Sequence, residues 1–589
     1  MKTSFVTLLL LIFGVHCYSQ TLPLARSVNW KLAGYNSEHS EPFYSVNFLN
    51  NGGVADGITP NDLALATLIN SIMNDSSEIY FPTGVYYFEQ PIVLNKKLTL
   101  RGASADSAVL LFNLINEDHL IKIAGSITTI ESVILNDIYK DSLQVDVLNP
   151  GLFATGDYIK ITENDSSLIT SSWALRSTGQ VNRIDSITGN TVYLISPLRR
   201  NFYFNKNVKM TKILPAEERV IENLMIFRQD TTVQQTSNIF FNYAINCKVK
   251  CIESVNCNYA HIAVDNSSNI EISGSYFHDA FSYGDGGKGY GVMLEFGTGE
   301  CLIKENIFNH LRHSMILQAG ANGNVFGYNY SINPFWTGTT FPSNSSGDIV
   351  LHGNYPYCNL FEGNVSQNIV IDDSHGQNGL HNTFFRNRAE LYGLYMNNSV
   401  PTNNQNFIGN EIPNTALFMG NYVLSGTGHF QFGNNIKGTI LPGGTSLLPE
   451  SSLYLDTIPP YYQQTSSWPP IGIPNLLSTY QNEIQIRYNS GKLTKCADSI
   501  SVINVNAIIS INDIKIVPNP TSTTINIVYI QESQNPILSI DVFSFSGEKV
   551  LSNTKRAGIS LEKLPGGFYF IKIRLADNQI VVRKIIKVN

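Results

Sequence analysis

Short apolar runs that end in asparagine repeat through the middle of the chain. Each run contains an apolar pair, such as Leu302-Ile303 in the first, and closes at Asn306, Asn329, Asn364, Asn387 or Asn410. The spacings are 23, 35, 23 and 23 residues. A fixed period in the low twenties predicts a β-solenoid, in which each unit stacks on its neighbours to bury its apolar face. The interval of 35 predicts one loop that bulges from a coil without breaking the stack.

Residues before the repeats alternate between a helical and an extended pattern. Asp56-Gly57 precedes a helical stretch over 63–73 with one apolar face, and strands follow at 79–86 and 98–102. The strands carry Phe-Pro-Thr-Gly-Val-Tyr and Leu-Arg-Gly motifs. This order resembles the first coils of the pectate lyase superfamily, in which a helix caps a right-handed parallel β-helix. The resemblance covers about 46–103 and implies an all-β solenoid domain over 44–497.

The period is lost between about 125 and 215. Alternating strands are predicted near 156–161 and 181–187, followed by a Thr-Gly-Asn turn. The segment is therefore interpreted as a β-rich insertion that hangs from one coil. Trp173 within it could wall a groove, although packing in the core of the insertion is the preferred interpretation.

The last 75 residues form a separate unit behind a linker at 498–513. Alternating strands divided by Gly and Pro predict a small β-sandwich over 514–589. Its motifs, from Ile516-Val517-Pro518-Asn519-Pro520 to Lys584-Ile585-Ile586-Lys587-Val588, resemble the C-terminal sorting domain of the type IX secretion system of Bacteroidetes. This resemblance implies export across the outer membrane, with the secretion machinery as a partner.

The start of the chain predicts export as well. Lys2 precedes an apolar run over 6–15 and small residues suited to cleavage, so residues 1–19 are interpreted as a signal peptide. The run is too short to span a membrane, and no integral membrane segment is expected elsewhere. The formal charge of −7 gives no reason to expect nucleic-acid binding. A secreted or cell-surface protein is predicted, with Cys247, Cys251 and Cys257 as thiols in the stacked core.

Candidate chemistry concentrates beside two loops that interrupt the period. Seven of the 11 histidines lie between His261 and His381, and the loops span 283–291 and 333–348. Side chains one period apart become neighbours in a solenoid, so offsets from the ladder asparagines place several charged groups on one side. The predicted catalytic residues are Arg312, His313, Asp372, Asp373 and His375. The predicted substrate-binding residues are Lys288, Gln318, Trp336, His352, Arg386 and Arg388.

Two reactions fit these residues, and a third function remains open. A lyase on a uronate polymer needs a cation for the sugar carboxylate, such as Arg312 or Arg386, and a base, such as His313 or His375. A hydrolase needs two carboxylates, for which Asp285, Asp348, Asp372 and Asp373 are candidates. Asp372-Asp373 lacks the partner motifs of polygalacturonases, and no calcium-binding pattern is recognisable, so a need for Ca²⁺ stays open. A lyase acting on an acidic extracellular polysaccharide is the leading hypothesis, ahead of a glycoside hydrolase and a non-catalytic glycan-binding or adhesion protein.

Overall fold

The computed structural model describes residues 21–36, 44–73, 77–284, 287–335, 347–397, 400–459, 462, 467–495, 514–519, 521–529, 537–544, 549–553, 557–575 and 580–588. The expected signal peptide and linker, as well as Trp336 and Asp285, lie outside the described residues.

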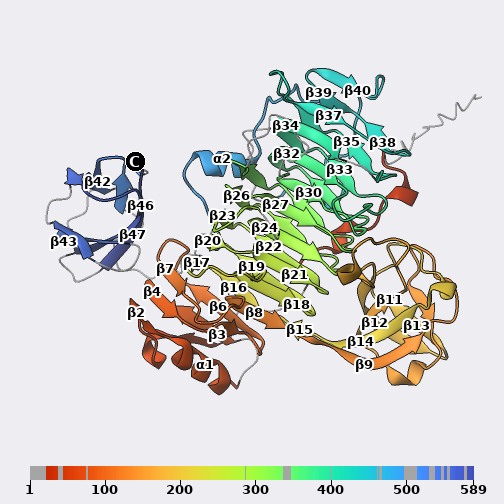
Figure 1. Ribbon diagram of the computed structural model, residues 1–589, viewed down its shortest axis with the longest axis horizontal. Coiled ribbons are helices and arrows are strands. Elements are labelled where there is room, and N and C mark those ends of the chain that lie inside the picture. The colour runs from red at the N-terminus through yellow and green to blue at the C-terminus, as the bar shows by residue number, and fades with distance from the viewer. Residues whose placement is uncertain are drawn as a thin grey trace, which may run out of the picture.

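Three long parallel sheets run along the molecule and enclose one core (Figure 1). The first sheet consists of β1 (Tyr44–Asn47), β3 (Ser77–Phe81), β6 (Leu98–Gly102), β16 (Val220–Glu222), β19 (Ala244–Lys250), β22 (Ser268–Ser273), β25 (Leu302–Lys304), β28 (Val325–Gly327), β31 (Leu360–Glu362), β33 (Thr383–Phe385), β35 (Asn406–Ile408) and β38 (Phe430–Phe432), with β15 (Ala216–Glu217) beside β19.

The second and third sheets are joined because two strands, β32 (Val365–Asp372) and β34 (Arg388–Asn397), run through both. The second sheet also contains β2 (Asp56–Pro60), β4 (Gly84–Phe88), β7 (Ala108–Phe112), β17 (Met225–Arg228), β20 (Glu253–Cys257), β23 (Tyr276–Ala280), β26 (Ile307–Asn309), β29 (Tyr330–Ile332), β36 (Glu411–Ile412), β39 (Asn434–Ile436) and the closing antiparallel β40 (Thr439–Leu441). The third contains β5 (Ile92–Val93), β8 (Ile121–Ala124), β18 (Ile239–Asn242), β21 (Ala260–Asp265), β24 (Tyr290–Glu295), β27 (His313–Leu317), β30 (Ile349–Leu351) and β37 (Asn421–Val423). The predicted right-handed parallel β-helix is confirmed.

Stacked side chains of equal position fill the interior. Phe326, Phe361, Phe384 and Phe407 stack in register, with successive ring centroids 5.2, 5.1 and 5.4 Å apart. All four rings are fully buried. The 23-residue period of the sequence is thus the length of one coil.

An asparagine ladder turns the chain from the first sheet to the second. The Asn364 side chain donates to the carbonyl of Phe326 (2.8 Å) and to Oδ1 of Asn387 (2.8 Å), and it accepts from the Asn329 N–H (2.9 Å). The same bonds recur at neighbouring coils, and these side chains are buried. Each amide therefore satisfies two backbone groups of the preceding coil and bonds to the asparagine side chain of the next, which explains why this residue type marks the period.

Replacing one rung should destabilise the stack. Asn364→Ala leaves the Asn329 N–H and the Phe326 carbonyl buried without their partners. We expect a loss of about 3 kcal/mol in the free energy of unfolding, because each orphaned buried group costs about 1–3 kcal/mol. Denaturant unfolding measures it. Asn205→Ala, at an exposed position of the insertion, is the control and should change stability little.

The first coils and one side of the solenoid are covered. Helix α1 (Asp62–Ser71) buries Leu65, Leu68 and Ile69 against the first coils. A second apolar cluster lies over the outer face of the first sheet. It joins Trp30 of the N-terminal segment to residues between Leu448 and Leu493, a part of the chain that contains α2 (Glu483–Asn489). These segments replace water on a sheet face that would otherwise be exposed.

A separate antiparallel sheet occupies residues 126–214. It consists of β9 (Ser126–Val133), β10 (Gln144–Asp146), β11 (Tyr158–Thr162), β12 (Gln180–Thr188), β13 (Thr191–Leu194) and β14 (Lys209–Leu214). This insertion has its own apolar core and lies beside the ends of β18 and β21 (Figure 1). It leaves the solenoid after β8 and returns at β15, so it arises from a turn between the third and first sheets.

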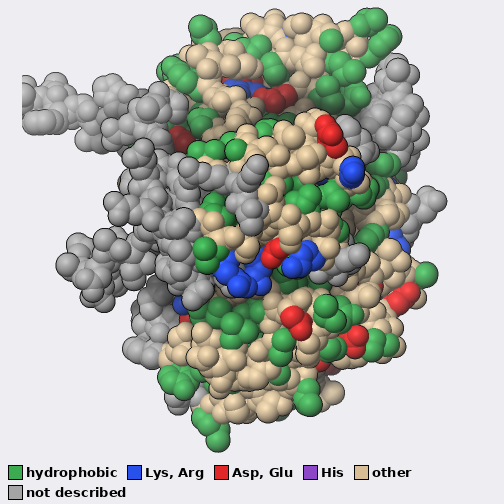
Figure 2. All heavy atoms as spheres, turned by 90° about the vertical axis from the view of Figure 1, so that its left-hand side faces the viewer, with side chains coloured by type: hydrophobic (Ala, Val, Ile, Leu, Met, Phe, Trp, Pro, Cys, Tyr) green, Lys and Arg blue, Asp and Glu red, His purple; other side chains and the backbone are tan. Residues whose placement is uncertain are grey.

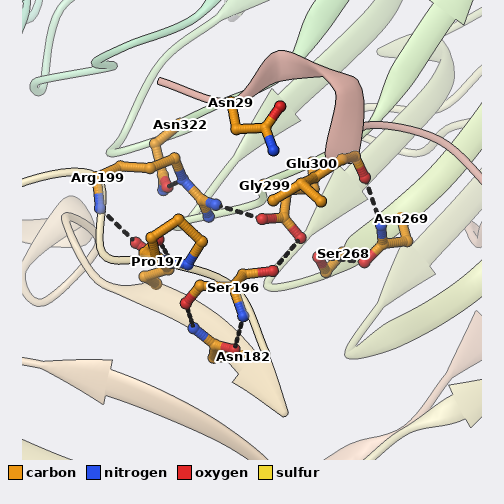
Figure 3. Close-up of polar contacts among 12 residues, drawn as sticks. Asn29, Asn182, Ser196, Pro197, Arg199, Ser268, Asn269, Gly299, Glu300 and Asn322 are labelled. Atoms are coloured by element: carbon orange, nitrogen blue, oxygen red, sulfur yellow. Dashed lines mark hydrogen bonds and ion pairs between the residues drawn. The ribbon is translucent and has the colours of Figure 1, made fainter. Parts of the chain in front are cut away.

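A buried ion pair clamps the insertion to the solenoid (Figure 3). Arg199 of the insertion donates to Glu300 (2.7 Å) and to Asn322 (2.6 Å), which lie on two successive solenoid turns. Ser196 of the insertion donates to the second oxygen of Glu300 at 3.1 Å. The side chains of Arg199 and Glu300 are only 4% and 7% exposed, so the pair excludes water.

The C-terminal residues form two small antiparallel sheets around one apolar core. These sheets consist of β41 (Ile514–Val517), β42 (Thr524–Tyr529) and β45 (Ile559–Ser560), and of β43 (Ile537–Ser544), β44 (Lys549–Asn553), β46 (Gly567–Leu575) and β47 (Ile580–Lys587). This unit matches the predicted small β-sandwich. None of the helices in the described part of the chain has the length and apolarity of a membrane-spanning segment.

The cysteines correct one expectation. Cys247 and Cys257 are free and buried in the solenoid, as expected of core thiols, and so are Cys301 and Cys358. Cys251 is instead disulfide-bonded, so its interpretation as a core thiol was wrong. It lies in the turn after β19, where a side chain can point away from the core.

Candidate functional site

One polar side chain per coil forms a row along the outer edge of the third sheet. Its members are Asp265, Glu295, Gln318, His352 and Asp372, called here the polar row. Strand pairing aligns them. Asp265 pairs with Glu295, and the residues just before Glu295, Gln318, His352 and Asp372 pair with one another from coil to coil. Those preceding residues lie in the solenoid core, so the row faces outward. Neighbouring members are about 4.8 Å apart along the sheet.

His352 and Asp372 form a hydrogen-bonded pair at one end of the row. Nδ1 of His352 lies 2.7 Å from Oδ2 of Asp372, whose other oxygen accepts from the Ser374 N–H at 3.0 Å. Burial alone would raise the pKa of Asp372, but the charge and hydrogen bond of His352, together with the Ser374 N–H, lower it to about 2. An ionised carboxylate only accepts hydrogen bonds, so Nδ1 of His352 carries a proton and Nε2 is the ring nitrogen that Asp372 does not engage.

An arc of rings lies over the outer face of the third sheet. Successive ring centroids are 5.4, 5.1, 5.6, 5.0 and 5.5 Å apart through Tyr259, Tyr290, His313, His352, His375 and Trp173. Below it lies an outer apolar cluster that includes Met293, Ile316 and Val350. The arc connects five successive solenoid coils to the insertion.

His313 is a neutral imidazole with one unused nitrogen. Its Nδ1 lies 3.1 Å from the carbonyl of Gly347, which can only accept, so Nδ1 carries the proton. Nε2 is buried and has no protein partner. Burial, followed by the charges of His352 and Arg312, lowers the pKa of His313 to about 3.

Arg312 supplies a positive charge at the edge of the arc. Its guanidinium donates to the carbonyl of Gly284 (3.1 Å) and lies 6.0 Å from the ring centroid of Tyr290. The side chain is half-buried and keeps contact with water. Burial raises the pKa of Tyr290 to about 12, although Arg312 opposes the shift, so the Tyr290 hydroxyl stays protonated at neutral pH.

The insertion walls the site on one side. Ser171 Oγ lies 3.2 Å from Nδ1 of His375, and Trp173 meets the same ring edge-on. Burial, followed by the charge of His352, lowers the pKa of His375. Trp173 is 46% exposed and lies outside the core of the insertion, so its preferred interpretation as a core residue was wrong.

A carboxyl pair occupies the other end of the polar row. Asp265 and Glu295 face each other on adjacent coils, and Gln318 donates to Glu295 at 2.7 Å. Burial raises the pKa of Glu295 to about 7, and burial together with the charge of Glu295 raises the pKa of Asp265. Lys160 of the insertion closes this end, donating to Asn266 (2.6 Å) and to the carbonyl of Phe296 (2.9 Å).

The raised pKa of Glu295 predicts a pH-dependent stability. The folded pKa lies above the ordinary value of about 4.3, so the contribution of Glu295 is full below that pH and is lost as the pH rises through about 7. Glu295→Gln removes this titration. We expect wild type to lose stability relative to Glu295→Gln between about pH 4 and pH 7, measured by denaturant unfolding across that range. Parallel pH profiles for the two proteins would contradict this expectation.

Several predicted site residues lie elsewhere. Arg386 is buried and donates to the carbonyls of Glu450, Ile471 and Ile473, under the segment that covers the first sheet. Arg388 is buried against Glu411 at 2.7 Å. Neither side chain reaches a substrate at the surface, which corrects their predicted binding role.

Three other candidates form hydrogen bonds to groups outside the His352–Asp372 pair. Lys288 donates to the carbonyl of Thr232 (2.6 Å). Asp373 accepts from the Val400 N–H at 2.6 Å. Asp348 is buried among Ser331 and the N–H groups of 367 and 368, so it cannot serve as an exposed carboxylate.

The structure thus brings together His313, Gln318, His352, Asp372 and His375, with Arg312 at the edge. Sequence reasoning missed the importance of Glu295 and Tyr290 and assigned His352 only to substrate binding. The sequence spacing could have indicated the His352–Asp372 pair, because His352 precedes Asp372 by 20 residues, which is close to the length of one coil. In the described residues, no group of three or more His, Cys, Asp or Glu is arranged to hold a metal ion.

Two parts of the chain match known families. Residues 45–161 match the model of "Rhamnogalacturonase A/epimerase, pectate lyase-like", and residues 515–588 match "Secretion system C-terminal sorting domain". No curated protein matches the chain.

Solved structures with a similar fold share little sequence. The Gp54 tailspike of Acinetobacter baumannii bacteriophage AP22 has 12% identity and a TM-score of 0.36 over 63% of this chain and 66% of that one. The tailspike gp61 of Pseudomonas phage phi297 has 11% identity and a TM-score of 0.45 over 68% and 81%. An exopolygalacturonase from Thermotoga maritima has 11% identity and a TM-score of 0.38 over 69% and 95%. The chain thus spans just under two thirds of the AP22 tailspike.

The chain thus combines a three-sheet parallel β-helix, whose first part is similar to pectate lyase-like proteins, with a C-terminal region that matches a sorting domain. The sorting domain assigns the chain to type IX export, to the cell surface or beyond, as predicted.

Proposed function

We propose that this protein is a polysaccharide lyase that acts on an acidic, uronate-containing polysaccharide at the outer face of the third sheet. The observation that carries the proposal is the His352–Asp372 pair on the same face as Tyr290 and Arg312, with the ring of His313 between His352 and Tyr290. A β-elimination needs a base, a cation for the sugar carboxylate and a proton donor for the leaving oxygen.

His352 is the base. Asp372 fixes its tautomer and stabilises the imidazolium that forms, so Nε2 can take the proton from the carbon beside the uronate carboxylate. Arg312 holds that carboxylate and offsets the charge that develops on it. The carbon–carbon double bond forms as the glycosidic C–O bond breaks, and the protonated hydroxyl of Tyr290 supplies the proton to the departing oxygen.

The neighbouring groups suit a sugar chain. Trp173 presents an exposed ring at the wall formed by the insertion, and aromatic faces pack against sugar rings. His313 offers an unpaired Nε2 that can accept a hydrogen bond from a sugar hydroxyl. A polymer lying along the polar row would meet both.

A glycoside hydrolase is the second candidate, favoured by the carboxyl pair. Glu295 keeps its proton up to about pH 7 and shares a hydrogen bond with Asp265 on the adjacent coil. A hydrolase needs two carboxyl groups, one of which donates a proton to the leaving oxygen.

One assay separates the functions. The full-length protein is incubated with a panel of uronate-containing polysaccharides, and ultraviolet absorbance of unsaturated uronates is followed beside new reducing ends. We expect both signals to rise together. Reducing ends without absorbance would overturn the lyase in favour of the hydrolase, and binding without either signal would indicate a glycan-binding protein.

A further inference from the structure

The outer face of the second sheet is apolar over its early coils. Val85, Val109, Leu111, Phe227 and Val255, called here the apolar stripe, align through strand pairing of β4, β7, β17 and β20. They form a cluster separate from the solenoid core, and four of them are at most 5% exposed. An apolar stripe of this length on an outer face needs a cover.

A chain of titratable groups continues the stripe. Nε2 of His278 lies 3.0 Å from Glu253, and Nδ1 lies 2.7 Å from Asp279. Asp279 also contacts Nδ1 of the exposed His310 at 3.2 Å. Glu253 and His278 are nearly fully buried.

The cover comes from the sorting domain of the same chain, which lies beside β7, β17 and β20 (Figure 1). Phe570 packs against the apolar stripe. Lys584 forms an ion pair with Glu253, and Phe568 lies 4.6 Å from Lys584 Nζ and 6.3 Å from the His278 ring. The contact thus matches apolar with apolar and positive with negative groups.

We propose that the outer face of β4, β7, β17 and β20 is a docking surface for the sorting domain, which folds back on the solenoid as a reversible cover locked by Glu253 and Lys584. In the docked state Lys584 and the phenylalanines of β46 face the solenoid and not a partner. The secretion machinery would therefore engage this face of the sorting domain only after it undocks.

Loose packing explains why the cover can leave. A cavity of about 430 Å³ lies within the contact, between Val109 and Leu111 on one side and Phe543 and Phe570 on the other. Permanent interfaces pack as tightly as protein interiors, so this gap gives up much of the attraction that full contact would supply. Figure 2 views this side of the molecule and shows acidic and basic side chains among hydrophobic and neutral ones on its outward surface.

Amine labelling of the full-length protein tests the lock. Acetylation by an N-hydroxysuccinimide ester, read by mass spectrometry, compares Lys584 with the exposed Lys563 of the same domain. We expect Lys584 to react on the order of tenfold more slowly, as ~1.4 kcal/mol of docking free energy would give. Glu253→Gln should raise its rate toward that of Lys563.

A second variant and a control keep the result interpretable. Leu111→Asp places a charge in the apolar stripe without touching Lys584 and should also release it. Glu271→Gln removes a carboxylate of the first sheet that pairs with Lys304 and should leave the protection unchanged. Equal rates for Lys584 and Lys563 in wild type, or unchanged protection in Glu253→Gln, would overturn the proposal.

Discussion

We expect His352→Gln to lower the rate of the proposed polysaccharide cleavage by on the order of a hundredfold or more, because it removes the proposed base while keeping a side chain of similar size. Asp372→Asn gives a smaller loss, since an amide oxygen can still hold Nδ1 of His352 but no longer stabilises the imidazolium. The measurement is the initial rate of unsaturated uronate formation across pH, with thermal unfolding to confirm that each variant folds.

His429→Gln is the matched control. This histidine hydrogen-bonds to Ser425 and Gln405, far along the stack from the polar row, and its replacement should leave the rate near that of wild type. Full activity of His352→Gln would show that the base lies elsewhere on the face.

Arg199→Met loosens the insertion and costs about 3–5 kcal/mol of unfolding free energy, because it leaves the Glu300 carboxylate buried without its cation. Adding Glu300→Gln to this variant should recover part of the loss, since no unpaired charge then remains. Denaturant unfolding gives the free energies, and hydrogen exchange in the strands of the insertion locates the effect.

Lys209→Met provides the comparison. It breaks an exposed pair with Glu131 on the same insertion and should cost less than about 1 kcal/mol. An equal loss from both variants would show that the Arg199–Glu300 clamp contributes no more than a surface pair.

The fold was readable from the sequence because its main contacts repeat at a constant distance along the chain. Asn364 bonds to residues one coil away on each side, and Phe361 stacks on equivalents at the same interval. Such contacts leave a periodic trace in the sequence.

Only part of the candidate site could be predicted from the sequence, because the contacts within it are not periodic. Offsets from the ladder placed His313, Asp372 and His375 on one side, and these rings and carboxylates do gather there. The prediction placed Arg386 at the surface, but it is buried by residues more than sixty positions later in the chain. The return of those residues to the first sheet leaves no periodic signal in the sequence. The contact of Trp173 with His375 likewise depends on how the insertion docks.

The ends of the insertion bear on how proteins of this fold can evolve. Gly125 and Ala216 bond to the carbonyls of the adjacent Asn242 and Tyr243 on the next coil, so the solenoid closes across the gap as if the segment were absent. Recombination at this point could exchange the wall that carries Trp173 while leaving the His352–Asp372 pair untouched. Substrate preference and reaction chemistry would then be inherited separately. Proteins that share the same coils could differ in the polysaccharide they recognise through replacement of the insertion alone.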